Sequence, residues 1–600
     1  MKDEPVSAVK EVFDPFHHLH DENYREQYLG LQVGADDMVA CAGRKSLSLD
    51  GNWFFTIDPF DEGLRQQWFA DEPLPPEQWP TPRDYEFARG ESIPVPACWT
   101  MVRPEWRHYE GGAWYSRILE WNGDVASRWV LRVGAANYLA RVFVNGRHMA
   151  THRGGSTPFF VELTQALQSG SNRIQIQVDN ERRDDHLPMR HFDWFNYGGI
   201  YREISLYELP RVFLRQALCR LEPDGSFSRL SASVTLSEPV DGEAIVSIPE
   251  LGVEQTIRVK RGKGEAAFAA QPLLWSPETP KLYDVHFRFA DDTVKDRIGF
   301  REIRVEGTGI FLNGGRLFLK GVCVHEDDVV LGKVSTREDV RRRLGHAREM
   351  GCNFLRLSHY PHHEHVAELA DEFGMLLWEE IPVYWAVDFA NPATFADASN
   401  QLREMIRRDG NRASVIVWGV GNENADSDAR YSFMSRLAEM AKKEDPTRLV
   451  SAACLINRQT FRIEDRLAGH LDIIGLNEYF GWYEPDVNGL RRLLSGSSPD
   501  KPVVISETGA DASAGYHGSP ETRYTEEFQA RYFERQIAIV REAGYICGIT
   551  PWILYDYRSE RRQTVFNRGF NRKGLIAEDK ATRKLAFGVL SKFYHSIGRE

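Results

Sequence analysis

The stretch Val415-Ile-Val-Trp-Gly-Val-Gly-Asn-Glu-Asn424 decides which fold the rest of the chain can adopt. Its β-branched start, residues 415–417, predicts a buried parallel strand that opens into a loop at the two glycines. Glu423 then lies just beyond the carboxyl end of a strand, where side chains meet substrate in α/β barrels. Pro502-Val-Val-Ile-Ser-Glu507 repeats the pattern, so we expect two carboxylates at one mouth.

Two alternatives apply to Glu423 and the glycines before it. A glutamate beside Asn at a strand end often only neighbours a helix cap, and one such residue would be structural more often than catalytic. Gly419-Val-Gly421 resembles part of a dinucleotide-binding loop, but the third glycine is missing and Asn422-Glu423 occupies the turn. Because the pattern recurs at two strand ends of one inferred barrel, we favour a pair of catalytic carboxylates.

After Gly314, apolar strand segments alternate with amphipathic helical segments, which predicts a C-terminal (β/α)8 TIM barrel. The eight strands are predicted at residues 317–324, 353–357, 375–378, 415–417, 449–454, 473–476, 503–505 and 549–554. Helices are predicted at residues 337–350 and 526–543, among others. Glu423 then follows the fourth strand and Glu507 the seventh.

The chain before the barrel predicts two β-sandwiches. Up to about Ser46 the chain is polar, which predicts an arm along the surface. Short alternating strands with recurrent turn signals follow and predict a jelly roll. The next hundred residues have the strand spacing of an immunoglobulin-like sandwich. We therefore assign residues 1–209 to the arm and the jelly-roll β-sandwich, 210–305 to the immunoglobulin-like β-sandwich, and 306–600 to the barrel.

The composition limits the partners and the compartment. A net charge of −13 argues against nucleic acid or an anionic membrane, and no apolar run among the 600 residues is long enough to span a membrane. The seven cysteines are dispersed and read as reduced thiols. The N-terminus shows no apolar leader, so we expect a cytoplasmic protein.

These features together resemble glycoside hydrolase family 2, which contains β-galactosidases, β-mannosidases and β-glucuronidases. The resemblance runs from Leu49 to about Phe593 and includes the three-part architecture, Asn422-Glu423 and Ser506-Glu507-Thr-Gly. Four segments are most similar to the β-glucuronidases: Asp193-Trp-Phe-Asn-Tyr-Gly-Gly-Ile-Tyr-Arg202, His325-Glu-Asp327, Asn477-Glu-Tyr-Phe-Gly-Trp-Tyr483 and Asn571-Arg-Lys573-Gly.

The resemblance implies a retaining mechanism that needs no cofactor and no metal. In such enzymes the two carboxyl groups lie about 5 to 5.5 Å apart. By position in the family, Glu423 is the acid/base, which has to be protonated before it acts, and Glu507 is the nucleophile, which has to be ionised. Asn422 is expected to hydrogen-bond the 2-hydroxyl group of the sugar.

The resemblance also implies further substrate-binding residues, each of which could instead be structural. Asn571 and Lys573 are expected at the carboxylate of a uronic acid, although Lys573 could be a surface lysine that closes the barrel. The other expected contacts are Asp193, His325, Asn477, Tyr479, Tyr483, Trp552 and Arg568, of which Trp552 is the one most easily read as a core residue.

Some residues depart from the β-glucuronidase pattern. Thr508 follows the nucleophile where an aromatic residue is common, Arg568 is offset by one position from its expected counterpart, and Glu478 and Phe480 differ as well. No long insertion interrupts residues 329–337, so the mouth is expected to be open to bulky or oligosaccharide aglycones. The stretch His359-Tyr-Pro-His-His-Glu-His365 raises a metal hypothesis, but carboxylate chemistry needs none, and we favour no metal.

The sequence leaves several functions open. The first is a β-glucuronidase that acts on small-molecule or oligosaccharide glucuronides, and the second is a β-galacturonidase or β-galactosidase of the same family. The third is a non-catalytic carbohydrate-binding relative, against which the intact Glu423 and Glu507 argue. We also expect a homo-oligomer, either a dimer or a tetramer.

Overall fold

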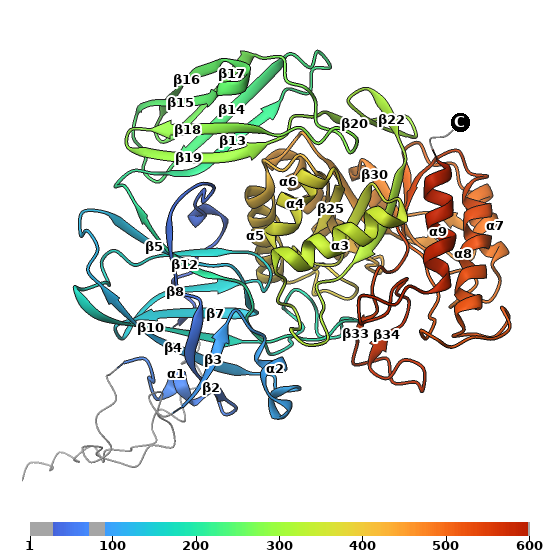
Figure 1. The fold of residues 1–600 in the computed structure, drawn as a ribbon, viewed down its shortest axis with the longest axis horizontal. Coiled ribbons are helices and arrows are strands. Elements are labelled where there is room, and N and C mark those ends of the chain that lie inside the picture. Colours follow the sequence, from blue (N-terminus) through green and yellow to red (C-terminus); the bar gives the residue numbers. More distant parts are fainter. Residues whose placement is uncertain (1–27, 71–89, 598–600) are drawn as a thin grey trace, which may run out of the picture.

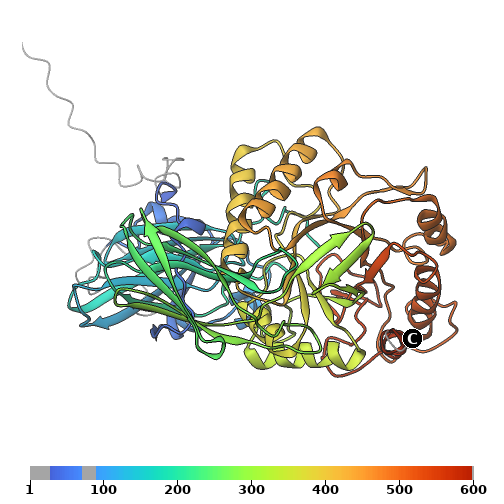
Figure 2. The ribbon, with the colours of Figure 1, turned by 90° about the horizontal axis from the view of Figure 1, so that it is seen from above.

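The computed structural model describes residues 28–70 and 90–597, which form three parts. A jelly roll and an immunoglobulin-like sandwich lie together on one flank of a closed barrel (Figure 1, Figure 2). This architecture confirms the predicted fold class. Residues 1–27 of the predicted arm lie outside the described residues. In the described ranges, no helix combines the length and the apolar character that a membrane crossing needs.

The jelly roll consists of two antiparallel sheets packed face to face. One has the order β1 (Ser46–Ser48), β12 (Ile204–Leu209), β5 (Arg128–Val133) and β9 (Phe159–Glu162). The other has the order β3 (Glu91–Val95), β2 (Gly51–Asp58), β4 (Gly112–Trp121), β10 (Gly170–Asp179), β7 (Leu139–Val144) and β8 (Arg147–Arg153). Short elements complete it: α1 (Glu62–Arg65), α2 (Trp99–Val102) and the pair β6 (Ala136–Asn137) and β11 (Gly199–Ile200). Side chains such as Trp53, Tyr115 and Ile176 form the core between the sheets.

The immunoglobulin-like part is built from seven antiparallel strands. Their order is β13 (Leu214–Leu221), β14 (Arg229–Leu236), β17 (Lys263–Ala269), β16 (Val253–Lys260), β15 (Gly242–Ile248), β18 (Tyr283–Phe289) and β19 (Asp292–Ile298). Only the ends of β16 and β17 pair, so the strands on either side of this hairpin can fold over one apolar core. A small sheet of β20 (Ile303–Glu306), β21 (Gly309–Leu312) and β22 (Gly315–Leu317) leads into the barrel.

Eight parallel strands close the barrel in chain order: β23 (Leu319–Val324), β24 (Phe354–Leu357), β25 (Leu376–Glu380), β26 (Val415–Asn422), β27 (Leu449–Cys454), β30 (Ile473–Asn477), β31 (Val503–Glu507) and β32 (Ile546–Ile549). Helices cover the outside: α3 (Arg337–Met350), α4 (Glu364–Phe373), α5 (Pro392–Asp409), α6 (Asp428–Glu444), α7 (Asn488–Gly496), α8 (Glu526–Val540) and α9 (Leu585–Ser596) (Figure 1). The 3-10 helix η8 (Arg466–His470) follows β27 in place of an α-helix. Two short hairpins lie in the loops: β28 (Ile456–Asn457) with β29 (Arg462–Ile463), and β33 (Tyr557–Arg558) with β34 (Phe570–Asn571).

The bounds of six barrel strands lie within two residues of the predicted ones, whereas the fourth and the eighth strand differ by more. Strand β26 continues through both glycines to Asn422, because there is no room for side chains there: a Cβ at Gly419 would lie 2.5 Å from the Cβ of Glu380. These glycines allow close packing inside a strand and form no dinucleotide loop. The eighth strand, predicted at 549–554, ends at Ile549, since Pro551 cannot donate to a sheet. Trp552 therefore lies in the loop after β32.

Irregular pairing at the strand ends directs side chains into the mouth of the barrel. The register shifts between Gly419 and Asn422 of β26 and between Leu476 and Asn477 of β30. Glu423 then leaves the strand with a φ of 51°, in the left-handed region that is uncommon for residues other than glycine. Such local departures from regular geometry are frequent beside active sites, because they re-aim one side chain without moving the strand.

Arg202 joins the jelly roll to the barrel through a buried ion pair. Its Nη2 lies 2.9 Å from Glu326 Oε2, and both side chains are almost fully buried. The guanidinium also donates to the carbonyl oxygens of Ser156 and Pro361, and the second oxygen of Glu326 accepts the His363 amide at 2.7 Å. Burial raises the pKa of Glu326, but Arg202 and the other basic groups around it together lower the pKa by more, so this carboxyl is ionised.

Arg202→Met should lower the free energy of unfolding by about 3 to 5 kcal/mol, because Glu326 would remain as an uncompensated buried charge. The double variant Arg202→Met/Glu326→Gln should recover part of this loss. Urea denaturation followed by tryptophan fluorescence measures both. Arg491→Met removes an exposed partner of Glu542 and serves as the control, for which little change is expected. An Arg202→Met variant as stable as this control would show that the pair does not hold the two parts together.

Candidate active site

Glu423 and Glu507 both lie at the carboxyl end of the barrel, where β26 and β31 finish. Glu507 is the last residue of its strand and is buried, whereas Glu423 is partly exposed just past its strand. The structure therefore brings together the two carboxylates that the sequence singled out. Arg356 donates both to Glu507 and to Asn422, the residue before Glu423, so one guanidinium connects the two strand ends.

Arg356 of β24 connects the nucleophile candidate to the strands on either side. Its five hydrogen bonds go to both carboxylate oxygens of Glu380, to the carbonyl oxygen of Ser506, to Glu507 Oε1 at 2.8 Å and to Asn422 Oδ1 at 2.8 Å. The guanidinium is fully buried, and no N–H is left without a partner. It can therefore orient Glu507 and stabilise its ionised form.

The second oxygen of Glu507 accepts a hydrogen bond from the Tyr479 hydroxyl group at 2.7 Å. This contact fixes the plane of the carboxylate from the side opposite to Arg356. It also places Tyr479 beside the Glu507 carboxylate, while a contact between Tyr479 and substrate stays a prediction.

Asn422 is oriented so that its amide nitrogen remains available. Its Oδ1 accepts from Arg356 and from Asn477 Nδ2, and Asn477 is itself fixed by the Ser506 hydroxyl group at 2.7 Å. The Nδ2 of Asn422 is buried and has no partner. A buried amide without an acceptor is costly, and a sugar hydroxyl group at this position would satisfy it.

The carboxyl group of Glu423 is suited to donate a proton. Burial and the nearby charge of Glu507 raise its pKa above the ordinary value, as a general acid requires. The Trp385 indole N–H donates to Glu423 Oε2 at 2.9 Å and opposes this rise, because it stabilises the ionised form. Trp385 lies in the loop after β25 and stacks on Tyr384.

Aromatic rings and the imidazole rings of His325 and His359 form the floor of the site. Trp552 stacks on the His359 ring with centroids 4.9 Å apart and meets His325 edge to face. Burial and the neighbouring His359 hold the pKa of His325 well below its usual range, so this ring is neutral. Its Nδ1 hydrogen-bonds the Tyr360 hydroxyl group, while its buried Nε2 has no partner and can meet a sugar hydroxyl group.

Lys573 is buried behind the mouth with its ammonium group near three aromatic rings. The Nζ atom donates to the Tyr483 hydroxyl group at 2.9 Å and lies 3.3 Å from Asp511 Oδ1. Asn571 accepts the Lys573 amide at its Oδ1 and donates to Tyr557. The reading of Lys573 as a surface lysine is therefore wrong, since its side chain is only 1% exposed.

Arg562, and not Arg568, is the arginine that reaches this cluster. Arg562 forms an ion pair with Asp193 of the jelly roll and donates to the Tyr483 hydroxyl group at 3.0 Å. Arg568 is exposed and donates to the Val565 carbonyl oxygen in its own loop. The expected substrate contact at Arg568 is thus not supported, because the offset of one residue turns the side chain away.

Thr508 and Glu478, which depart from the family pattern, both form hydrogen bonds inside the barrel. Thr508 is buried and its hydroxyl group bonds Tyr532 at 2.7 Å, so it lines the shell behind the nucleophile and forms no wall of the site. Burial raises the pKa of Glu478 to about 7, and its carboxylate accepts the Phe480 amide.

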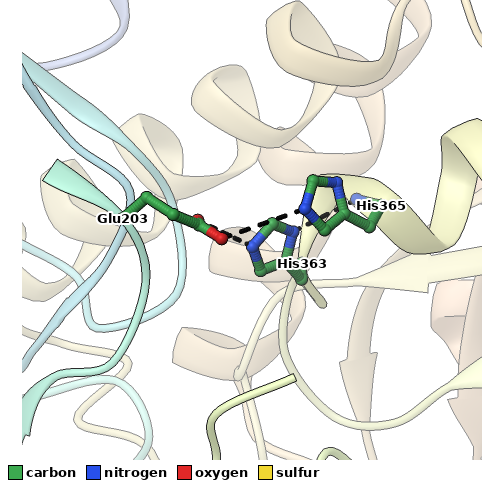
Figure 3. A group of neighbouring side chains, drawn as sticks. All are labelled: Glu203, His363 and His365. Carbon is green, nitrogen blue, oxygen red and sulfur yellow. Dashed lines mark hydrogen bonds and ion pairs between the residues drawn. The ribbon is translucent and has the colours of Figure 1, made fainter. Parts of the chain in front are cut away.

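The histidines of residues 359–365 lie in two places. His359 stacks on Trp552 in the site, whereas His363 and His365 lie at the junction with the jelly roll. His362 is buried and its Nε2 bonds the Ser358 carbonyl oxygen. His363 and His365 instead converge on Glu203 of the jelly roll, with His363 Nε2 2.9 Å and His365 Nε2 3.9 Å from its carboxylate oxygens (Figure 3). Because His363 Nδ1 accepts the His365 amide, the ring proton is on Nε2 and points to Glu203. A metal there would have to displace that proton, and the absence of a metal stays a prediction.

Sequence reasoning missed five residues that the site depends on: Arg356, His359 as a partner of Glu380, Glu380 itself, Trp385 and Arg562. A signal was present for the first, because an arginine inside the apolar Phe354-Leu-Arg-Leu357 strand of a barrel must find a buried partner. No local signal marks Trp385 or Arg562, since both lie in irregular loops.

The three parts of the chain match three models of one family. The sugar binding domain of glycosyl hydrolases family 2 matches residues 46–210, the central family 2 domain matches 227–301, and the family 2 TIM barrel domain matches 303–597. The chain therefore belongs to glycosyl hydrolases family 2, and it is a glycosidase.

Individual members of the family that are similar to this chain include β-glucuronidases and a β-galacturonidase. The chain is 28% identical to a β-glucuronidase of Paenibacillus borealis, over 92% of this chain and 97% of the relative, and 28% identical to that of Homo sapiens, over 95% and 94%. It superposes on Ruminococcus gnavus β-glucuronidase in complex with D-glucuronic acid with a TM-score of 0.82 at 24% identity, covering 94% and 100% of the chains. A β-galacturonidase from Eisenbergiella tayi gives a TM-score of 0.79 at 28% identity, covering 92% and 97%.

Trp385→Phe should shift the alkaline limb of the pH profile of kcat/KM to higher pH. The indole N–H stabilises the ionised form of Glu423, so its removal raises the pKa of Glu423 further and keeps the acid protonated to higher pH. One hydrogen bond to a charged group corresponds to a shift of about one pH unit. An unchanged limb, or one that moves to lower pH, would contradict the assignment of Glu423 as the acid.

Proposed function

We propose that the chain is a retaining exo-glycosidase that removes terminal β-D-glucuronic acid from glucuronides. One observation carries the choice of a uronic acid: the buried ammonium group of Lys573 lies at the Tyr483 hydroxyl group and near the ring of Tyr479, whose own hydroxyl group donates to Glu507. A charged lysine in such a place has to be paired, and the carboxylate of a uronic acid can join that pairing. The named activity of the curated relatives supports the proposal.

In the first step, Glu507 attacks the anomeric carbon while Glu423 gives its proton to the leaving oxygen. The bond from carbon to the leaving group breaks, and a covalent glycosyl-enzyme with inverted configuration forms. Arg356 and Tyr479 hold the attacking carboxylate in place before the reaction, so little reorganisation is needed. The free Nδ2 of Asn422 meets the 2-hydroxyl group of the sugar.

In the second step, Glu423 acts as a base and takes a proton from water, whose oxygen attacks the anomeric carbon. The bond to Glu507 breaks, and the second inversion restores the original configuration. Once Glu507 carries the sugar, its charge no longer acts on Glu423. The pKa of Glu423 then falls, as its new role requires.

The charges around the uronate position are arranged in pairs. Lys573 faces Asp511, and Arg562 faces Asp193. The Tyr483 hydroxyl group connects the two cations. A substrate carboxylate therefore gains hydrogen bonds from preorganised donors, while the resident carboxylates keep both cations fixed before substrate arrives.

A β-galacturonidase is the second candidate. The carboxylate that Asn571 and Lys573 would bind is common to glucuronic and galacturonic acid, and the E. tayi β-galacturonidase is among the similar structures. The test is kcat/KM for the 4-nitrophenyl β-glycosides of glucuronic acid, galacturonic acid and galactose. We expect the glucuronide to be the best substrate. A preference for the galacturonide or the galactoside would overturn the proposal, and inactivity on all three would favour a non-catalytic relative.

Lys573→Ala should reduce kcat/KM on the glucuronide at least ten- to a hundredfold, the value of one charge-assisted hydrogen bond of about 1.5 to 3 kcal/mol. The loss should be larger than this, because Asp511 would then face the substrate carboxylate unpaired. Lys573→Ala/Asp511→Asn removes that repulsion and should recover part of the activity. On the galactoside, kcat/KM of both variants should stay close to that of the wild type.

Lys580→Ala is the matched control for this comparison. Lys580 is also a buried lysine, paired with Asp328 at 2.6 Å, but it contacts none of the candidate site residues in the described part of the chain. It should change the rates on uronide and neutral glycoside equally. If Lys573→Ala behaves in the same way, Lys573 only shapes the barrel and the preference for a uronic acid has another cause.

A cytoplasmic location and a homo-oligomeric assembly, a dimer or a tetramer, stay predictions. Light scattering after size-exclusion chromatography measures the second.

A further inference from the structure

Arg561 lies at the mouth of the site, and its guanidinium makes no hydrogen bond with residues 28–70 or 90–597. The side chain is 51% exposed, and the closest approach to a carboxylate is 4.0 Å, between its Nε and Asp193 Oδ1. That carboxylate is already occupied by the Ser559 hydroxyl group and by Arg562. The N–H groups of Arg561 are therefore available to a ligand. This positive charge stands out in a protein whose net charge is −13.

The position of Arg561 is fixed from both sides of its loop. Glu560 is hydrogen-bonded to His108 of the jelly roll at 2.9 Å, while Arg562 is held by Asp193 and Tyr483. Between these two anchors, the Arg561 guanidinium lies over the Trp385 ring, 4.8 Å from its centroid. These contacts hold the Arg561 guanidinium in a defined position at the mouth of the site.

Trp385 connects this cation to the chemistry. Its indole N–H donates to Glu423, the residue that protonates the leaving oxygen. A group attached to that oxygen must therefore leave past the Trp385 ring. Arg561 lies over that ring, so a charged substituent on the leaving group comes within its reach.

The chemistry of a guanidinium selects the substituent. Its planar N–H groups match the two oxygens of a carboxylate or a sulfate, and stacking on an aromatic ring leaves these in-plane donors free. We propose that Arg561 and Trp385 form a leaving-group subsite that binds an oxyanion on the aglycone, and this rests on the proposed glucuronidase activity. Two sources share that chemistry: an acidic or sulfated sugar, and an aromatic aglycone that carries a carboxylate.

A simpler role for Arg561 is to brace Trp385 and so position Glu423. The two roles differ in what they predict for neutral aglycones. A brace acts on every substrate, and its loss would also alter the pH profile through Glu423. A subsite acts only where the leaving group carries the anion.

The test compares Arg561→Gln, Arg561→Lys and wild type on two matched pairs of substrates. The first pair is 4-nitrophenyl β-glucuronide and its 3-carboxy-4-nitrophenyl analogue. The second is a glucuronyl-β-1,3-N-acetylhexosamine disaccharide with and without a 6-sulfate. Ratios of variant to wild type on each substrate cancel the differences in leaving-group reactivity.

Arg561→Gln should lose about five- to thirtyfold in kcat/KM on at least one anionic substrate, the range for one charge-assisted hydrogen bond at a partly exposed site. On the neutral partners the change should stay within about twofold, and the pH profile should not move. Arg561→Lys should keep part of the effect, since it retains the charge without the planar fork. The pair that shows the loss identifies the source of the oxyanion.

Arg103→Gln is the matched control, because Arg103 is 48% exposed and also lies over a tryptophan ring, that of Trp106 in the jelly roll. It should leave all four substrates unchanged. Equal losses on anionic and neutral substrates in Arg561→Gln, or no loss on any, would overturn the subsite. Failure of the proposed function looks different, because the wild type itself would then not cleave the neutral glucuronide.

Discussion

The buried guanidinium of Arg356 is the interaction on which the site depends. It lies inside a barrel strand and uses its N–H groups to hold Glu380, Glu507, Asn422 and the Ser506 carbonyl oxygen. A buried guanidinium needs charged and polar partners to offset its loss of hydration, and here the partners of all five N–H groups come from β25, β26 and β31. The energetic requirement of one cation thereby fixes Glu507, the proposed nucleophile, and Asn422, the proposed contact of the 2-hydroxyl group, relative to each other.

This arrangement lets two carboxylic acids of the same mouth behave differently. Glu507 receives hydrogen bonds from Arg356 and Tyr479 and is stabilised as an anion. Burial and the charge of Glu507 raise the pKa of Glu423, and the hydrogen bonds from Trp385 and Asn477 do not offset this rise. The division of roles follows from the number of donors and charges around each group, as in other enzymes that combine an acid and a base.

The fold could be predicted, and Glu423 and Glu507 could be singled out as candidates, because their signals are local. Apolar strands, amphipathic helices and a polar residue at a strand end are all visible in a window of ten residues. Arg562 and Asp193 could not be predicted as partners, because they come from different domains and meet only when the jelly roll docks on the barrel. Distance along the chain predicts Arg568 instead, but this distance does not determine the direction of a side chain in an irregular loop. The histidines 363 and 365 illustrate the same limit, since their partner Glu203 lies in another domain.

In the proposed mechanism, Glu507 forms the covalent bond to the sugar. The most direct measurement is the mass of the intact protein after incubation with 2-deoxy-2-fluoro-β-D-glucuronyl fluoride, followed by mapping of the labelled peptide. The fluorine slows both steps, and the activated leaving group keeps the first fast enough for the intermediate to accumulate. We expect one added 2-fluoroglucuronyl group per chain, on Glu507. A label on another carboxylate, or complete inactivation without any covalent adduct, would contradict the account.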